Sequence, residues 1–271
     1  MLTKSKQKLL LSALKDYHKK YLKRLNPELD ESGTRIMINA LLTDVLGFMP
    51  IDEVKTEQLI RGAYADYVIQ LKGKRYFLVE AKKQGIDLSE KHLRQARQYC
   101  ADEGIEWALL TNGKHFELYK IILESTKPIK INDRKVFSID LGDLENLKEN
   151  VQLIQFLHKI SVSDKGLDLL WDKCVALDPK NIAGLLYTPP VANFIKGQLR
   201  KKYKHQFSDE EIEIAIDKVV QEAIPLEEVA TFKVRKSKRK NTNGENHGPN
   251  SDNQIVNVTS PTIIEQPKPT V

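Results

Sequence analysis

The spacing of apolar residues predicts that the chain begins with two helices. Apolar positions recur three to four residues apart over 4–25, and Asn26-Pro27 ends that pattern. The same spacing returns from about Asp30 to Val45, and Gly47 follows as a C-terminal stop. Both helices are therefore expected before the first strand of the chain.

After residue 52 the pattern becomes that of β-strands. Residues 53–60 form a first predicted strand, and 65–71 and 75–82 are rich in Tyr, Val, Ile, Leu and Phe. Gly73 lies in a polar gap between the last two, which predicts a hairpin. We take its loop to be Lys72-Gly73-Lys74, because this length decides which side chains of the hairpin share a face.

Three charged residues interrupt the apolar pattern of this hairpin: Asp66, Glu80 and Lys82. With a three-residue loop Asp66 falls opposite Glu80, and opposed Cβ atoms lie roughly 5 Å apart on one face. Lys82 shares that face, because side chains alternate along a strand, whereas Ala81 points into the core. A two-residue loop would shift the pairing by one residue and part the two acids.

Such a trio favours metal-assisted chemistry on a phosphate. Two neighbouring carboxylates repel each other unless a positive charge lies between them. Mg²⁺ prefers oxygen ligands and is commonly held by one or two carboxylates, waters and phosphate oxygens. A bound ion activates a water for attack, and the ammonium of Lys82 would support the developing negative charge. Asp66, Glu80 and Lys82 alone leave a surface hairpin with ordinary charges as the alternative.

The segment after the hairpin alternates helix and strand. A helix is expected at 90–100, and Trp107–Thr111 reads as a buried strand. Asn112-Gly113 is a strong signal for a tight turn, which leads to a partner strand at 115–121. Residues 136–140 add an edge strand. This order predicts an α/β fold with a mixed sheet and a right-handed crossover.

The hairpin resembles the PD-(D/E)XK nuclease superfamily, in which an Asp precedes a hairpin and Glu-x-Lys follows it. Asp66, Glu80 and Lys82 stand in those places, with Ala65 where the motif has Pro. Residues from Glu31 to about Lys120 resemble more closely the N-terminal nuclease domain of the R subunit of type I restriction enzymes. That resemblance implies a restriction-endonuclease-like sheet flanked by helices.

Two further elements carry this resemblance. The family has Gln-x-x-x-Tyr on the helix after the hairpin, and this chain has Gln95 and Tyr99 there, on one helical face. It also has an acidic residue with Thr-Arg in its first helix, and this chain has Glu31 followed by Thr34 and Arg35. From the residues alone, Glu31 could equally favour the helix N-terminus, and Tyr99 could be packing. Arg35, one turn after Glu31, is expected to pair with Glu31 or with a phosphate.

The resemblance implies a full set of site residues. The implied catalytic residues are Asp66, Glu80, Lys82, Gln95 and Tyr99, and the implied metal ligands are Asp66, Glu80 and Glu31.

Composition and charge fit a polyanion partner. The chain is 41% hydrophobic and 30% charged, and no apolar run reaches the roughly 20 residues needed to cross a bilayer. The net charge of +6 is concentrated at 15–24, 200–204 and 233–240. Solvated helix faces are the favoured explanation of the first two clusters. Cys100 and Cys174 lack metal-ligand spacing, so packed thiols in a reducing cytoplasm are expected.

From Asp143 onward the spacing is helical: one or two helices are expected at 144–160, and further helices at 165–176 and 191–203. Ser208 and Glu211 form a capping box that begins a last helix, which ends at about Ile224, and beyond Glu228 the periodicity is lost. The final segment combines a basic run with Asn, Gly, Ser, Pro and Thr, which cannot bury enough apolar surface to fold. We therefore expect three parts: a restriction-endonuclease-like nuclease domain at 1–142, a helical appendage at 143–228 and a disordered basic tail at 229–271.

The expected function is a Mg²⁺-dependent or Mn²⁺-dependent DNA endonuclease. No Gly-x-x-x-x-Gly-Lys-[Ser/Thr] motif occurs, so no helicase motor is expected in this chain. DNA is the expected partner, with a motor or specificity subunit as a further one; no membrane partner is expected, and the oligomeric state stays open. The rival hypothesis is a catalytically inactive nuclease-fold module that binds DNA or docks a partner. A nuclease acting on RNA is a third.

Overall fold

Six strands form a single mixed sheet within the part of the chain that the structure describes. The structure is a computed structural model that describes residues 1–23, 29–60, 63–124 and 130–223. The tail expected at 229–271, with its basic run, lies outside these residues. The strands are β1 (Val54–Ile60), β2 (Ala63–Leu71), β3 (Lys74–Ala81), β4 (Trp107–Thr111), β5 (His115–Glu124) and β6 (Lys130–Asp140).

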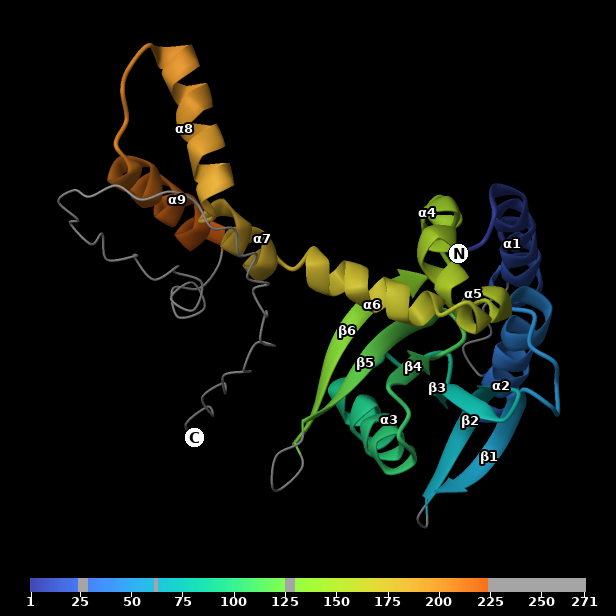
Figure 1. Ribbon diagram of the computed structural model, residues 1–271. Coiled ribbons are helices and arrows are strands. Elements are labelled where there is room, and N and C mark those ends of the chain that lie inside the picture. Colours follow the sequence, from blue (N-terminus) through green and yellow to red (C-terminus); the bar gives the residue numbers. More distant parts are fainter. Residues whose placement is uncertain (24–28, 61–62, 125–129, 224–271) are drawn as a thin grey trace. The chain divides into compact units, whose positions relative to one another are not determined.

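The strands lie across the sheet in chain order, as Figure 1 shows. Within this sheet β3 and β4 run parallel, and the other neighbours are antiparallel. A parallel pair needs a long crossover connection, and α3 (Glu90–Glu103) supplies it between β3 and β4. The predicted α/β fold, a restriction-endonuclease-like mixed sheet flanked by helices, is confirmed.

The other helices lie before and after the sheet in the sequence. They are α1 (Lys4–Tyr17), α2 (Glu31–Ala40), α4 (Leu147–Ile154), α5 (Lys159–Ser163), α6 (Gly166–Ala176), α7 (Pro179–Leu186), α8 (Pro189–Tyr203) and α9 (Asp209–Ala223). α1 and α2 each continue into a π-helical turn, at His18–Leu22 and Leu41–Val45. No helix in the described ranges has the length and apolar character to cross a membrane.

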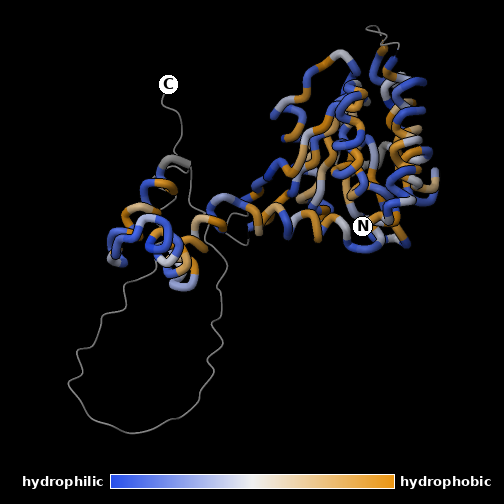
Figure 2. The backbone as a smooth tube through the Cα atoms, turned by 90° about the horizontal axis from the view of Figure 1, so that it is seen from above, coloured by the Kyte–Doolittle hydropathy of each residue, from blue (hydrophilic) through white to orange (hydrophobic). Residues whose placement is uncertain are grey.

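The sheet has a separate apolar core on each of its faces. α1, α2, α4 and α6 pack on one face, where they meet side chains such as Phe77, Val79 and Ala81. α3 packs on the other face, against Leu78 and its neighbours (Figure 1). Figure 2 shows apolar residues along the strands and alternating apolar and polar residues along the helices. Successive β3 residues therefore serve opposite cores, and Ala81 points away from α3, as predicted.

The hairpin between β2 and β3 differs from the sequence prediction in its loop. Leu71 pairs with Lys74, so the loop has two residues, Lys72 and Gly73, and both have positive φ. This is the pattern of a type I′ turn. A two-residue loop by itself would shift the pairing by one residue and separate Asp66 from Glu80. A β-bulge in the hairpin shifts the register back.

The bulge lies at Tyr76. Gln70 pairs with Arg75 and Ile69 pairs with Phe77, which leaves Tyr76 as the extra residue on β3. Beyond it, Tyr67 pairs with Val79, and this register continues to place Asp66 opposite Glu80. The predicted loop length was wrong, but the bulge offsets the shorter loop, and both acids line one pocket.

The helical region after the sheet contains one element that the sequence reading did not expect. Its α7 begins at Pro179, and the Asp178 side chain accepts a hydrogen bond from the backbone N–H of Lys180. α9 begins with the predicted capping box, in which Ser208 and Glu211 bond reciprocally to each other's backbone N–H. The residues of α7, α8 and α9 form their own small core. The division into domains at 142 and 228 stays a prediction.

The turn between β2 and β3 gives a stability test. Gly73 has φ +79, a left-handed conformation that costs other residues about 1 kcal/mol or more. We expect Gly73→Ala to lower the free energy of unfolding by about 1 kcal/mol, measured by urea denaturation. Gly85→Ala is the matched control, because its added Cβ meets no atom and its φ is ordinary. Equal stability of both variants and the wild type would contradict the turn assignment.

Candidate active site

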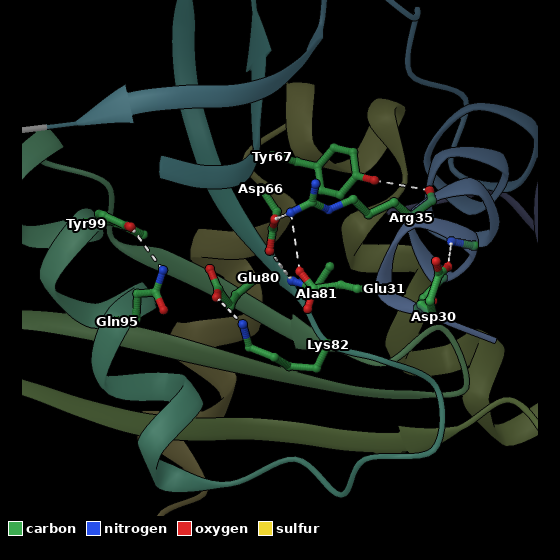
Figure 3. Close-up of polar contacts among 12 residues, drawn as sticks. Asp30, Glu31, Arg35, Asp66, Tyr67, Glu80, Ala81, Lys82, Gln95 and Tyr99 are labelled. Carbon is green, nitrogen blue, oxygen red and sulfur yellow. Dashed lines mark hydrogen bonds and ion pairs between the residues drawn. The ribbon is translucent and has the colours of Figure 1, made fainter. Parts of the chain in front are cut away.

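A pocket of about 340 Å³ opens where α2, β2, β3 and α3 come together. Its lining brings together residues that are far apart in the sequence: Glu31, Arg35, Ala65, Asp66, Glu80, Lys82 and Gln95. Figure 3 shows the polar side chains of this pocket and their contacts. Most of the site residues predicted from the sequence therefore share one cavity.

Asp66 is buried on β2 and bonded on both of its carboxylate oxygens. Its Oδ2 accepts a hydrogen bond of 2.8 Å from the backbone N–H of Ala81, which ties it to β3. Its Oδ1 pairs with the guanidinium of Arg35 from α2. The Asp66 carboxylate is thus fixed from two sides and faces the pocket.

Glu80 carries the least compensated charge in the pocket. Its side chain is 2% exposed, and its Oε1 accepts a hydrogen bond of 2.6 Å from Lys82 Nζ. Its Oε2 is buried and has no hydrogen-bond partner in the described part of the chain. Burial raises the pKa of Glu80 to about 7, although Lys82 opposes this and the nearby charge of Asp66 adds to it.

Arg35 contacts both Glu31 of α2 and Asp66 of β2. Its Nη2 donates to Asp66 and also lies 3.3 Å from Oε1 of Glu31, one turn earlier on α2. Its backbone carbonyl accepts a hydrogen bond of 3.1 Å from the hydroxyl of Tyr67, which anchors α2 to β2. Glu31 itself is 47% exposed, so in this structure its visible role is as a partner of Arg35.

Gln95 and Tyr99 lie one turn apart on α3 and are bonded to each other. The Gln95 amide donates to the Tyr99 hydroxyl at 3.0 Å (Figure 3). Gln95 lines the pocket, whereas Tyr99 is 4% exposed and belongs to the core beneath α3. Tyr99 therefore bears on the pocket through Gln95, which it holds in place.

The pocket fits a divalent cation with two protein carboxylates as ligands. The buried Glu80 oxygen without a partner is a free ligand position, and Asp66 lies opposite on the adjacent strand. Mg²⁺ commonly uses one or two carboxylates and keeps several waters. No group of three or more His, Cys, Asp and Glu side chains placed to hold a metal occurs among the described residues. The metal role of Glu31 stays a prediction.

Sequence reasoning found the pocket but missed one of its central contacts. It placed Asp66, Glu80 and Lys82 on one face, and all three line the pocket. It paired Arg35 with Glu31 or a phosphate, and did not foresee its contact with Asp66. No local pattern encodes that contact, because Arg35 and Asp66 lie 31 residues apart in the sequence.

The comparison with protein families assigns this region. Residues 37–133 match the family described as the type I restriction enzyme R protein N terminus. This span belongs to that family. Among curated proteins and among solved structures, none matches the chain.

The restriction R-protein domain includes most of the pocket. The family match contains Asp66, Glu80, Lys82 and Gln95, and Arg35 lies just before it. The description of the family places its members in type I restriction enzymes. The helices from α4 to α9 lie beyond the matched residues.

Glu80 makes the stability of this R-protein domain depend on pH. The folded protein keeps the Glu80 proton up to about pH 7, whereas the unfolded chain releases it near pH 4.5. Between these values the folded state binds more protons, so the free energy of unfolding falls as the pH rises. Without metal, we expect wild type to lose on the order of 2 kcal/mol relative to Glu80→Gln between pH 5 and 8.

Urea denaturation of both proteins in EDTA at pH 5 and pH 8 measures this difference. Parallel pH profiles for wild type and Glu80→Gln would contradict the raised pKa of Glu80.

Proposed function

We propose that the chain is a Mg²⁺-dependent DNA endonuclease of the restriction type, with Mn²⁺ as an alternative ion. The observation that carries the proposal is the buried Glu80 carboxylate, which has one oxygen on Lys82 and the other without a partner. A buried carboxylate in this state is costly unless a cation binds it. Asp66 on the neighbouring strand supplies the second ligand.

Each residue of the pocket has a distinct role in this proposal. Asp66 and Glu80 hold the ion, which when bound lowers the pKa of a water and polarises the phosphate. Lys82 already touches Glu80 and presents its ammonium toward the same pocket, where it stabilises charge on the phosphate as it is attacked. Gln95 positions a phosphate oxygen or the water, and Tyr99 keeps the Gln95 amide in place.

Arg35 changes partner when the ion binds. In this structure its guanidinium pairs with the Asp66 carboxylate. The proposed ion needs that same carboxylate as a ligand. If Asp66 held an ion, the Arg35 guanidinium would give up this contact. Guanidinium groups bind phosphate with two parallel hydrogen bonds. Arg35 is then available to the scissile phosphate.

The family and the charge of the chain support DNA as the substrate. The R protein is a component of restriction enzymes, and the chain carries a net charge of +6. A cytoplasmic location and a motor or specificity subunit as partner belong to the same proposal. The described residues contain no motif for reading base edges, so the affinity for DNA would come mainly from contacts to phosphates.

A second function is favoured by a specific observation. Arg35 occupies Asp66, and no group of three metal-ligating side chains occurs within the described ranges. A nuclease-fold module that binds DNA or docks a partner, without cutting, would show the same contacts. Metal binding and cleavage separate the two functions.

Cleavage of supercoiled plasmid with Mg²⁺ tests the role of Lys82. We expect Lys82→Ala to lower the rate of nicking by about 100-fold or more, because the ammonium no longer stabilises the transition state. Lys83→Ala is the matched control, because Lys83 is the next residue and does not line the pocket. Equal nicking by wild type and Lys82→Ala would rule out this mechanism.

Calorimetric titration with Mg²⁺ or Mn²⁺ tests the ligands and the competition by Arg35. We expect Asp66→Asn to weaken binding at least about tenfold, because a charged ligand is lost. We expect Arg35→Gln to tighten binding several-fold, because a competing cation is removed. Asp87→Asn, which removes an exposed acid that does not line the pocket, should leave the affinity unchanged.

Two outcomes of this titration would count against the endonuclease. If Asp66→Asn binds the ion as tightly as wild type while DNA binding survives, the non-cutting module is the better account. If Arg35→Gln binds the ion more weakly than wild type, Arg35 is not a competitor of the metal.

A further inference from the structure

A second hollow adjoins the pocket, between α3 and Ile131 of β6. It has a volume of about 750 Å³ and is lined by Lys91, Arg94, Gln95, Arg97, Gln98 and Ile131. We call it the α3 groove. Gln95 lines both the groove and the pocket, so the groove begins where the pocket ends.

The positive charges of the α3 groove are largely uncommitted. Lys91 and Arg94 are exposed, and neither forms an ion pair with any residue that the structure describes. Arg97 differs, because its Nη1 lies 2.5 Å from Asp133 and its Nη2 lies 3.6 Å from Glu90. No acidic residue is among those that line the groove. Lys91 and Arg94 are therefore available to an anionic ligand.

A cation of the groove lies close to a cation of the pocket. His92 lies on α3 beside Lys91, and burial lowers the pKa of its imidazole. The ammonium groups of Lys82 and Lys91 lower the pKa of His92 further. The His92 imidazole is therefore close enough to Lys82 of the pocket and Lys91 of the groove for both charges to act on it. Neighbouring cations of this kind attract a run of phosphates rather than a single one.

The lining of the groove favours phosphates over bases. It contains no aromatic side chain on which a base could stack, and Ile131 is its apolar member. The amides of Gln95 and Gln98 can donate hydrogen bonds to phosphate oxygens. Lys91 and Arg94 are three residues apart on a helix, so they are neighbours on its surface. These are contacts to a nucleic-acid backbone and carry no sequence information.

We propose that the α3 groove binds the backbone of the DNA strand next to the scissile phosphate, with Lys91 and Arg94 on its phosphates. The strand leaves the pocket past Gln95 and continues along α3. This inference rests on the proposed endonuclease function, because it assigns the flanking contacts of that same substrate. It also makes the binding independent of sequence on this side of the cut.

DNA binding measured against salt concentration tests the groove. All proteins in this assay carry Lys82→Ala, which blocks cleavage so that Mg²⁺ can be included. Binding of a labelled DNA duplex is measured by fluorescence anisotropy. We expect Lys91→Ala/Arg94→Ala to weaken binding at least about tenfold on two duplexes of unrelated sequence. The slope of log K against log salt should become less steep by about two, roughly one for each lost phosphate contact.

Two variants control for net charge and for shape. Lys4→Ala/Lys8→Ala removes the same charge from exposed positions on α1 and should leave affinity and slope unchanged. Lys91→Arg/Arg94→Lys keeps the charge of the groove and should bind as the parent does. The inference is overturned if the alanine pair of the groove behaves like the α1 pair, or if the charge-keeping pair binds as poorly as the alanine pair.

These results are distinguishable from failure of the proposed function. If wild type cuts DNA and the groove variants bind like the α1 control, the groove assignment alone is wrong. If the chain neither binds nor cuts DNA, the endonuclease proposal is wrong and the groove assignment goes with it.

Discussion

The burial of the Glu80 carboxylate beside a second acid, Asp66, is the constraint on which the rest of this site depends. Asp66 and Glu80 lie opposite each other on neighbouring strands, and both are nearly removed from water. The charge of Asp66 adds to the burial that raises the pKa of Glu80, and such a pair is costly unless cations compensate it. The protein answers with Arg35 on one acid and Lys82 on the other, yet one oxygen of Glu80 stays without a partner. The site therefore destabilises the fold most when Arg35 and Lys82 are the only cations that compensate the two acids.

The elements around the site can be understood as the means to hold this pair. The bulge at Tyr76 sets the register that brings the acids together, and Ala81 donates its backbone N–H to Asp66. Tyr67 binds the α2 backbone at Arg35, so the helix that delivers the guanidinium is tied to the strand that carries the acid. α3 closes the remaining side with a glutamine and continues outward as a basic surface. One end of the sheet thereby places the pocket next to the α3 groove.

Much of this arrangement could be predicted from the sequence, because it follows from local periodicity. The alternation along β3 placed Glu80 and Lys82 on one face, and the spacing of Gln95 and Tyr99 placed them on one side of α3. The bulge could not be foreseen, because nothing in the residues around Tyr76 distinguishes a bulged from a regular strand. The contact between Arg35 and Asp66 depends on how α2 packs on the sheet, which no local pattern encodes. α7 was missed because it is short and its signal, Asp178-Pro179, also fits a turn.

The most direct test of the central claim is the position of a bound ion. Crystals soaked in Mn²⁺ would locate it by its anomalous scattering. The account predicts an ion bound between Asp66 and Glu80, with the Glu80 oxygen that lacks a partner among its ligands and the Arg35 guanidinium withdrawn from Asp66. An ion bound elsewhere, or Arg35 still paired with Asp66 while Mn²⁺ saturates the protein, would contradict it.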